Sequence, residues 1–460
     1  MIRMFNHWFS WRSVAGALFD CSFLIVSLII IFMWISSGLS VNVQQVIIFA
    51  GFFALAMLAV NLLLGMYHRA TTRSYSDNRA RAVLALYFAV PIAYGLYGLL
   101  PITTLDRDLI HLSAMSAVFG MLVTRVGATH TSNTKMLRRR LLVFGTGAQA
   151  IAVKQALEHS DPSAEIIGYY PGANEDHPQV VPTMVLSRDR SLTDTARNLG
   201  ADEIVVALSE RRGGSMPLRE LLDCKLLGIR VLDLASHFEQ TLGQIRLDSL
   251  YAGWLIFGDG FRQGTIRTAV KRLFDIACAS ILIILALPVM LLAAILIVLE
   301  DGFPLLYRQE RVGLNGRLFN VIKFRSMRRD AEKDGKPIWA QAKDNRVTRI
   351  GQVIRKLRVD ELPQLFSVLK GDMSLVGPRP ERPFFVDQLT KEIPFYAVRH
   401  SVKPGVTGWA QVRYHYGATV EDSAEKLQYD LYYVKNHSLF LDLVILFETV
   451  GVVLTGKGAH

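Results

Sequence analysis

The first part of the chain contains four long apolar stretches. They cover residues 14–35, 46–66, 82–100 and 109–126. Each stretch has roughly the length that an α-helix needs to cross a bilayer, and the first is too long for a removable signal peptide. Pro91 interrupts the third stretch and Arg107 lies just before the fourth, so these two are less typical of membrane spans. The pattern predicts a transmembrane four-helix bundle over residues 1–135.

Basic residues are distributed unevenly between these stretches. Arg3 and Arg12 precede the first stretch, and the loop that follows it carries no charge. The next loop has arginines at positions 69, 73, 79 and 81, and Lys135 follows the fourth stretch. Because Lys and Arg are enriched in cytoplasmic loops, we expect both ends of the bundle on the cytoplasmic side. No paired acids interrupt the stretches, so the expected role is an anchor rather than a pore.

The pattern changes after residue 140. A short apolar strand leads into the turn GTGAQA, which contains Gly145 and Gly147, and then into a helix, as in a dinucleotide-binding fingerprint. Strands and helices continue to alternate, which predicts a Rossmann-like α/β domain with a parallel sheet over residues 136–262. Gly145 and Gly147 are therefore candidate cofactor-binding residues. The next strand, 165–170, ends without the acidic residue that would hold a ribose, so tight strand–helix packing is the favoured alternative.

A fifth apolar segment, residues 273–299, carries Pro288 near its middle. It is long enough to span a membrane, but Lys271 precedes it and Arg308 follows it. A single crossing would put one of these basic flanks on the wrong side of the membrane. Proline also removes one helical hydrogen bond and kinks a helix. A re-entrant helix that breaks at Pro288 and returns to the cytoplasmic side satisfies both observations, and a fifth true span is the alternative.

Two adjacent carboxylates, Asp360 and Glu361, lie near the start of the stretch 358–380. Apolar residues then recur at i, i+3, i+4 and i+7, which predicts a helix with Gly371 as its C-cap. Asp360 and Glu361 are expected at the helix N-terminus, where free backbone N–H groups and the helix dipole favour anionic ligands. Helical neighbours diverge by about 100°, so the two carboxylates serve different purposes. Taken alone, Asp360 reads as a simple N-cap.

Composition supports a membrane protein with several units. A chain of 460 residues exceeds one ordinary domain, and its apolar fraction of 51% is high for a soluble protein. The formal charge of +11 suits nucleic acid, an anionic membrane surface or phosphorylated substrates. The three cysteines are widely separated, which predicts neither a disulfide framework nor a metal site.

Single basic residues stand beside glycine and proline turns after residue 300. They are Arg311 in QERVG, Lys323 and Arg325 in KFRSM, Arg346 and Arg349 in DNRVTRIG, and Arg379 in GPRP. Several such residues close to a membrane segment predict a clamp for phosphate groups. Nucleic acid is not the expected partner, because these cations are spread singly through apolar sequence and form no basic stripe.

The order of the motifs carries a resemblance to a known family. The segments QERVG, KFRSM, DNRVTRIG, DELPQ, GDMSLVGPRP and KPGVTGWAQ follow one another in the last two-fifths of the chain. This set resembles the bacterial sugar transferase family, the monotopic polyprenyl-phosphate phosphoglycosyl transferases. The anchor and the α/β domain resemble the large members that start exopolysaccharide, capsule or O-antigen repeat units. Two departures are Leu287, where a small hydroxyl residue would precede Pro288, and Val359, where many relatives have Leu.

The resemblance implies a mainly α-helical monotopic catalytic domain over residues 263–460, at the cytoplasmic face of a bacterial inner membrane. It implies transfer of hexose 1-phosphate, with glucose or galactose as the sugar, from a UDP-sugar to undecaprenyl phosphate with release of UMP. Asp360 would attack the sugar-bearing phosphorus to form a covalent intermediate, and Glu361 would hold Mg²⁺. Lys323, Arg325 and Arg379 would neutralise phosphate charge. The expected substrate-binding set is Glu310, Arg311, Arg346, Arg349, Gln364 and Asp430.

Alternatives remain open at two levels. Glu310 and Arg311 equally suit a turn ion pair, and Asp430 equally suits a helix carboxylate with no role in the site. The whole chain could instead be a membrane-anchored regulator that senses a nucleotide, or a scaffold for polysaccharide assembly. The intact DELPQ and GPRP motifs argue against the regulator, and only the four-span bundle supports the scaffold. A homodimer through the bundle or the middle domain is compatible with each of these functions.

Overall fold

The computed structural model describes residues 2–4, 7–9, 11–35, 43–64, 75–99, 111–123, 138–160, 164–173, 175, 178–208, 216–250, 260–261, 264–328, 346–414, 417 and 419–455. The loop positions 69, 73 and 135 used to predict membrane orientation lie outside these residues. So do positions 262 and 263, where the second and third domains are predicted to meet. The chain divides into two compact units. The first comprises residues 1–2 and 8–242, and the second comprises residues 3–7 and 243–460. Near the N-terminus, the short strands β1 (Ile2–Met4) and β2 (His7–Phe9) pair with each other.

The N-terminal helices share one apolar core. They are α1 (Trp11–Ile35), α2 (Val43–Leu63), α3 (Tyr75–Leu99) and the shorter helix His111–Val123. Phe53 and Met57 of α2 are fully buried in this core. Three buried alanines of α3, at positions 85, 89 and 93, recur every four residues, and such small side chains let helices approach closely.

Among the described residues, two of the four predicted spans are long and apolar enough to cross a membrane. They are Val14–Ile31 and Val43–Leu62. The third and fourth predicted stretches are helical, but their apolar parts, Tyr87–Leu99 and His111–Val123, are shorter. The described residues therefore contain several apolar helices near the N-terminus, and the four-span anchor stays a prediction.

The α/β domain is built around a parallel sheet with strand order β4-β3-β5-β6. The strands are β3 (Arg139–Phe144), β4 (Ala164–Tyr170), β5 (Glu203–Val206) and β6 (Arg230–Asp233), and the helices are α5 (Ala148–Ser160), α6 (Leu192–Asn198), α7 (Leu218–Leu226) and α8 (Leu234–Leu242), with a short η3 (Pro182–Met184). Alternate residues of β3 enter two separate apolar cores, because successive strand side chains point to opposite faces. The predicted parallel sheet is confirmed. Its order is that of flavodoxin-like doubly wound sheets and differs from the dinucleotide-binding order, in which the first strand neighbours the fourth.

The glycine turn after β3 is closed by contacts within its own domain. Gly145 has a φ of +130°, and an added Cβ would lie 2.5 Å from the carbonyl oxygen of Ala207, so glycine is required there. Thr146 donates to Glu175 Oε2 from its amide at 2.7 Å and from its hydroxyl at 3.1 Å. The Gly172 amide donates to the same oxygen at 3.1 Å. One oxygen of Glu175 thus accepts from both Thr146 donors, whereas Glu175 Oε1 and Gln149 Oε1 are buried without a hydrogen-bond partner among the described residues. Cofactor binding at Gly145 and Gly147 stays a prediction.

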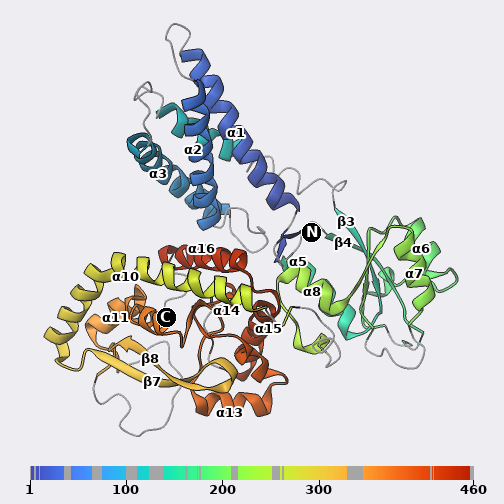
Figure 1. The fold of residues 1–460 in the computed structure, drawn as a ribbon. Coiled ribbons are helices and arrows are strands. Elements are labelled where there is room, and N and C mark those ends of the chain that lie inside the picture. Colours follow the sequence, from blue (N-terminus) through green and yellow to red (C-terminus); the bar gives the residue numbers. More distant parts are fainter. Residues whose placement is uncertain are drawn as a thin grey trace. The chain divides into compact units, whose positions relative to one another are not determined.

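The second unit contains the long helix α10 (Thr265–Asp301). The helix continues through Pro288, so the break predicted there is instead a curve within one helix, as Figure 1 shows. Helical hydrogen bonds on both sides of a proline can hold such a helix together although the proline itself donates none. All three cysteines of the chain are free.

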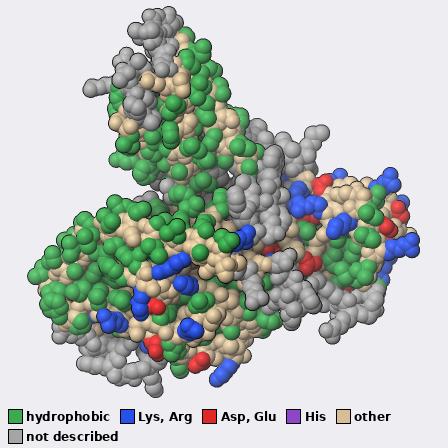
Figure 2. All heavy atoms as spheres, viewed as in Figure 1, with side chains coloured by type: hydrophobic (Ala, Val, Ile, Leu, Met, Phe, Trp, Pro, Cys, Tyr) green, Lys and Arg blue, Asp and Glu red, His purple; other side chains and the backbone are tan. Residues whose placement is uncertain are grey.

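Both halves of α10 pack against the same unit. In the first half, Ala279 belongs to the main core, whereas Ala293 and Ile297 of the second half pack with Phe324 and Ile354. The opposite side of the helix is apolar and exposed; Ile284, for example, is 71% exposed. Figure 2 shows apolar side chains gathered along this helix.

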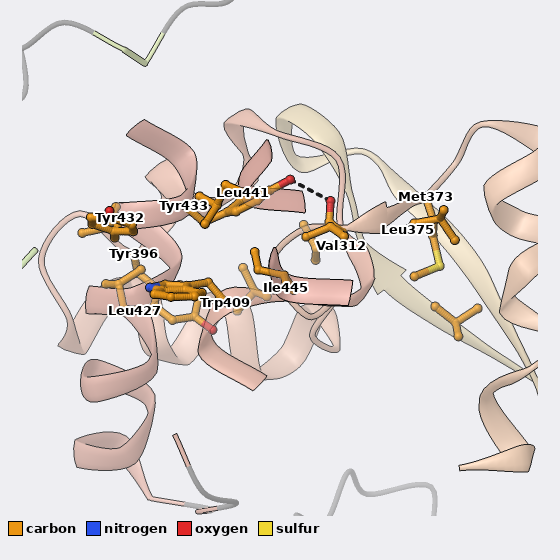
Figure 3. Close-up of a cluster of buried hydrophobic side chains, with 14 of the residues drawn as sticks. Val312, Met373, Leu375, Tyr396, Trp409, Leu427, Tyr432, Tyr433, Leu441 and Ile445 are labelled. Atoms are coloured by element: carbon orange, nitrogen blue, oxygen red, sulfur yellow. Dashed lines mark hydrogen bonds between the residues drawn. The ribbon is translucent and has the colours of Figure 1, made fainter. Parts of the chain in front are cut away.

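The remainder of the second unit is mainly helical, as predicted. Its strands are β7 (Leu306–Val312) and β8 (Leu318–Phe324), an antiparallel pair, and β9 (Ser374–Val376) and β10 (Gly405–Thr407), a parallel pair. Its other helices are η4 (Leu247–Ser249), η5 (Leu314–Gly316), α11 (Arg349–Lys356), η6 (Val359–Glu361), α12 (Gln364–Lys370), α13 (Pro383–Glu392), η7 (Tyr396–Ser401), α14 (Trp409–Arg413), α15 (Val420–Asn436) and α16 (Leu439–Thr455). Figure 3 shows the main core, in which Trp409, Tyr432 and Tyr433 meet Leu441 and Ile445 of α16.

Candidate functional site

Asp360 and Glu361 lie in the 3₁₀ turn η6, which joins α11 to α12. The prediction that they occupy the first turn of the following helix is wrong, because α12 begins only at Gln364. Pro363 has no N–H and cannot form the α-helical bond to the residue four positions earlier, so the tighter turn precedes it. Arg358 enters the turn with a left-handed φ of +58°, a strained conformation for a residue other than glycine. Gly371 ends α12 with a φ of +99°, which confirms the predicted C-cap.

The Glu361 carboxylate is surrounded by cations. Lys323 Nζ and Arg379 Nη2 each lie 2.8 Å from Glu361 Oε1, and Arg358 Nη1 lies 3.9 Å from the same oxygen. Burial alone would raise the pKa of this carboxyl, but Arg379, Lys323 and Arg358 hold the pKa well below its ordinary value. Glu361 is therefore ionised at neutral pH.

The Asp360 carboxylate has a different environment. It is 8% exposed and accepts no hydrogen bond from any residue that the structure describes. Burial, followed by the charge of Glu361, raises the pKa of Asp360, and Lys323, Arg355 and Arg379 oppose this increase. The interpretation of Asp360 as a simple N-cap is therefore wrong, since its side chain caps no helix.

The site carries an excess of positive charge. Lys323, Arg355, Arg358 and Arg379 are the four cations that act on the carboxylates of Asp360 and Glu361. Four positive and two negative charges leave a formal charge of +2. In a partly buried site this excess favours an anionic ligand such as a diphosphate.

Arg325 makes different contacts from Lys323, although both belong to KFRSM. Its Nη2 donates to the carbonyl oxygens of Asp301 at 3.0 Å and Gly302 at 2.6 Å. It also lies 3.1 Å from the Asp301 carboxylate. Arg325 thus caps the end of α10, where cations stabilise the free carbonyl groups. A contact of Arg325 with substrate phosphate stays a prediction.

Glu310 and Arg311 point away from each other on β7. Arg311 Nη1 donates to the Pro380 carbonyl at 3.1 Å and lies 3.3 Å from Glu381 Oε2. Glu310 is exposed, as expected for strand neighbours that face opposite sides. The alternative prediction of a turn ion pair between Glu310 and Arg311 is therefore wrong, because Arg311 pairs with Glu381.

The remaining predicted residues lie at three different places. Gln364, four residues after Asp360, is 3% exposed, and its Nε2 has no hydrogen-bond partner among the described residues. Asp430 is buried on α15 and pairs with Arg399 at 2.7 Å. Arg346 and Arg349 stand at the start of α11, and Arg349 is exposed.

Comparison with known proteins identifies the unit that holds this site. A family model described as bacterial sugar transferase matches residues 266–456. A UDP-glucose:undecaprenyl-phosphate glucose-1-phosphate transferase of Caulobacter vibrioides is 44% identical over 193 residues, which cover 41% of this chain and 72% of that protein. The chain belongs to the bacterial sugar transferase family.

Two further relatives carry names with a different sugar. A UDP-N-acetylgalactosamine-undecaprenyl-phosphate N-acetylgalactosaminephosphotransferase of Aeromonas hydrophila is 48% identical over 242 residues, which cover 53% of this chain and 56% of that protein. A putative undecaprenyl-phosphate N-acetylgalactosaminyl 1-phosphate transferase of Bacillus subtilis is 55% identical over 131 residues, 28% of this chain and 73% of that protein. The sugar transferase match thus spans about half the length of the Aeromonas protein, and the named sugars differ among relatives.

Three arginines of this sugar transferase unit were not predicted from the sequence. Arg355 and Arg358 act on the two carboxylates from α11 and from the turn that follows it. Arg399 pairs with Asp430 and donates to the carbonyl oxygen of Arg379 at 3.0 Å. The one available signal was that a lone arginine inside an apolar segment must find an acid when it is buried. The sequence does not reveal which acid that is.

Proposed function

We propose that this sugar transferase moves hexose 1-phosphate from a UDP-sugar to undecaprenyl phosphate and releases UMP, as the first membrane step of exopolysaccharide, capsule or O-antigen synthesis. The observation that carries the proposal is the nearly buried Asp360 carboxylate, which has no hydrogen-bond partner among the described residues. It lies next to Glu361, whose charge is offset by Lys323 and Arg379. The names of the relatives support a UDP-sugar and undecaprenyl phosphate as substrates.

In the first step, a carboxylate oxygen of Asp360 attacks the sugar-bearing phosphorus. A bond forms from this oxygen to phosphorus, and the bond from phosphorus to the UMP oxygen breaks, with UMP keeping the electron pair. The undecaprenyl phosphate oxygen then attacks the same phosphorus and releases the Asp360 carboxylate. Because the Asp360 carboxylate accepts no hydrogen bond from the described residues, none has to break before this carboxylate attacks. Lys323 and Arg379 can leave Glu361 and pair with oxygens of the substrate, and so stabilise the charge of the phosphate.

Glu361 suits a Mg²⁺ ion. Its Oε1 accepts from Lys323 and Arg379, whereas its Oε2 accepts no hydrogen bond from the described part of the chain. No group of three or more His, Cys, Asp or Glu gathers among the described residues. One carboxylate can be enough for Mg²⁺, because proteins often hold this ion through one or two carboxylates while water and substrate phosphates complete its coordination. A bound ion would neutralise charge on the diphosphate and on the leaving UMP.

Gln364 supplies a candidate donor for substrate. Its buried Nε2 lacks a hydrogen-bond partner among the described residues, although a buried amide donor left unpaired costs about 1–3 kcal/mol. A phosphate or sugar oxygen bound beside Asp360 would satisfy this donor and recover that cost.

We further propose that α10 is a re-entrant membrane helix. Its 37 residues extend about 55 Å, more than a bilayer core of about 30 Å requires. Both halves pack on one unit while the opposite side stays apolar and exposed, as expected for a helix that enters and leaves the membrane on one side. With the basic loops of the bundle, this arrangement supports a catalytic unit at the cytoplasmic face of the inner membrane. A homodimer through the bundle or the α/β domain is compatible with it.

UMP release tests the proposed reaction directly. The full chain in nanodiscs is supplied with undecaprenyl phosphate, Mg²⁺ and, in turn, UDP-glucose, UDP-galactose and UDP-N-acetylgalactosamine. We expect UMP from at least one sugar and, without acceptor lipid, a mass increase on the protein equal to the phosphate of that sugar. Asp360→Asn should lose both signals, whereas Asp387→Asn, at an exposed position on α13, should keep them. Full turnover by Asp360→Asn would refute the covalent step, and no UMP from any sugar would refute the function.

Cysteine labelling tests the re-entrant helix. Ile266→Cys and Leu299→Cys place thiols at exposed positions near the two ends of α10, which are 79% and 78% exposed. The three native cysteines are first replaced by serine. A membrane-impermeant maleimide should label both positions from the cytoplasmic side of vesicles. Labelling from opposite sides would show a single crossing.

A further inference from the structure

Four consecutive carbonyl groups of the turn 378–381 accept hydrogen bonds from other parts of the unit. Two donors are amides: Gly405 N–H bonds to the Pro378 oxygen at 3.0 Å, and Val312 N–H bonds to the Glu381 oxygen at 3.0 Å. The two donors between them are guanidinium groups. Arg399 Nη2 bonds to the Arg379 oxygen at 3.0 Å, and Arg311 Nη1 bonds to the Pro380 oxygen at 3.1 Å.

The turn depends on these outside donors. Pro378 and Pro380 have no N–H groups, so the turn has few amides with which to close on itself. It carries Arg379, whose Nη2 lies 2.8 Å from Glu361 Oε1. A shift of the Arg379 carbonyl would therefore move the guanidinium that the proposed function assigns to substrate phosphate.

Arg399 is itself held rigidly. It is 5% exposed, and its Nε and Nη2 bond to Asp430 Oδ2 at 3.0 and 2.7 Å. Its Nη1 donates to the Tyr396 hydroxyl at 2.8 Å, and its guanidinium lies 5.1 Å from the centre of the Tyr396 ring. Asp430 and Tyr396 are also buried. The planar fork of arginine can serve an acid, a hydroxyl and a carbonyl at once, which the single ammonium of lysine cannot do in the same geometry.

We propose that Arg399, held by Asp430, is a positioning residue that sets Arg379 for the phosphate of the substrate. It acts through the main-chain carbonyl of Arg379 and touches no reacting group itself. Its effect on turnover rests on the proposed function, whereas its effect on the turn does not.

Two variants test this role. Arg399→Lys keeps a charge next to Asp430 but removes the fork that reaches the Arg379 carbonyl. The paired variant Arg399→Gln with Asp430→Asn removes both charges, so neither is left buried alone, and it covers the case in which lysine still reaches that carbonyl. Arg413→Gln is the matched control, because Arg413 forms an ion pair with Glu448 at 2.7 Å in the same unit and stacks on Trp409.

The first measurement is a double-mutant cycle with Arg379→Ala. Arg399→Lys should lower kcat about 10-fold and leave KM for the UDP-sugar within about twofold, the size of effect seen when the support of a functional group is lost. Arg379→Ala should lower kcat about 100-fold. Adding Arg399→Lys to Arg379→Ala should lower kcat no further, because position 399 then has no Arg379 guanidinium to hold in place. Arg413→Gln should leave kcat within about twofold of wild type, and its effect on kcat should multiply with that of Arg379→Ala.

The second measurement is hydrogen exchange of peptides covering 377–382, which needs no activity. Both Arg399 variants should exchange faster there, and Arg413→Gln should not. Unchanged exchange in both Arg399 variants, or losses that multiply with Arg379→Ala, would overturn the proposal. If wild type releases no UMP, the proposed function fails, and the exchange measurement still decides whether Arg399 holds the turn.

Discussion

The glycine turn of the α/β domain and the carboxylate turn of the sugar transferase unit differ in the polar groups around their carboxylates. Both turns precede a helix, and both suggested an anion site from sequence. In the α/β domain, Glu175 accepts from the amide and hydroxyl of Thr146 and from the amide of Gly172. In the sugar transferase unit, Asp360 accepts no hydrogen bond within the described residues although it is nearly buried. Buried oxygens without a partner also occur at the glycine turn, at Gln149 Oε1 and Glu175 Oε1. The two turns differ instead in the groups around their carboxylates, which are amides and a hydroxyl at Glu175 and cations at Asp360 and Glu361.

The contrast has a thermodynamic meaning. A buried carboxylate that accepts several hydrogen bonds stabilises the fold, whereas one without partners costs stability. Arg358, whose φ is left-handed, adds backbone strain close to Asp360. Such costs are typical of positions that are kept for chemistry, because the surrounding structure must compensate for them.

Among the variants that keep Asp360, the largest expected effect comes from removing the charge of Glu361. Glu361→Gln should lower kcat about 10²–10³-fold and weaken the dependence of turnover on Mg²⁺, since the amide cannot replace a carboxylate ligand and leaves Lys323 and Arg379 without their acid. The measurement is kcat as a function of Mg²⁺ concentration. Glu392→Gln, on the exposed side of α13, should match wild type. An unchanged dependence of kcat on Mg²⁺ in Glu361→Gln would show that Glu361 does not hold the ion.

Asp360→Asn should stabilise the unit that it inactivates. The pKa of Asp360 is raised by burial and by Glu361, so the folded state holds the proton more tightly than the unfolded state. The contribution of Asp360 to stability therefore falls as pH rises from the ordinary carboxyl pKa of about 3.9 through the raised pKa. At pH 7 the variant should gain about 1–2 kcal/mol, because a neutral amide is cheaper to bury than an unpaired charge.

Thermal unfolding of the full chain between pH 4 and 8 provides the measurement for Asp360→Asn. The gain over wild type should be largest at the upper end and shrink toward pH 4, which is near the ordinary carboxyl pKa, because the free-energy cost of ionising the buried Asp360 is then small. Asp387→Asn serves as the exposed control. A variant that is less stable than wild type at pH 7 would show that Asp360 is satisfied in the native protein, and the contrast between the two turns would be lost.

The smallest effect is expected in the α/β domain. Glu175→Gln should destabilise this domain by about 1 kcal/mol, because it weakens three charge-assisted hydrogen bonds. Hydrogen exchange at the turn 145–149 should become faster, while UMP release stays at the wild-type rate. Slower exchange in the variant would mean that the Glu175 carboxylate is not the partner of this turn.

The sequence predicted those features that depend on local pattern. Alternating strands and helices predicted the parallel sheet, the left-handed cap at Gly371 was correct, and the ordered motifs located Lys323, Asp360, Glu361 and Arg379. These properties follow from periodicity, turn chemistry and motif order, each of which is contained in a short segment.

Only the tertiary structure decided which groups meet. The sequence did not reveal that Arg325 caps α10 while Lys323, two residues earlier, reaches Glu361. Nor did it reveal that Arg399 donates to the carbonyl of Arg379, or that Glu175 accepts from Thr146 while Asp360 accepts no hydrogen bond within the described residues. A charged side chain is stabilised by whichever partner lies within a few ångströms, and that partner is often far away along the chain. The sequence therefore determined which residues are candidates for the chemistry, and the fold determined which groups surround each of them.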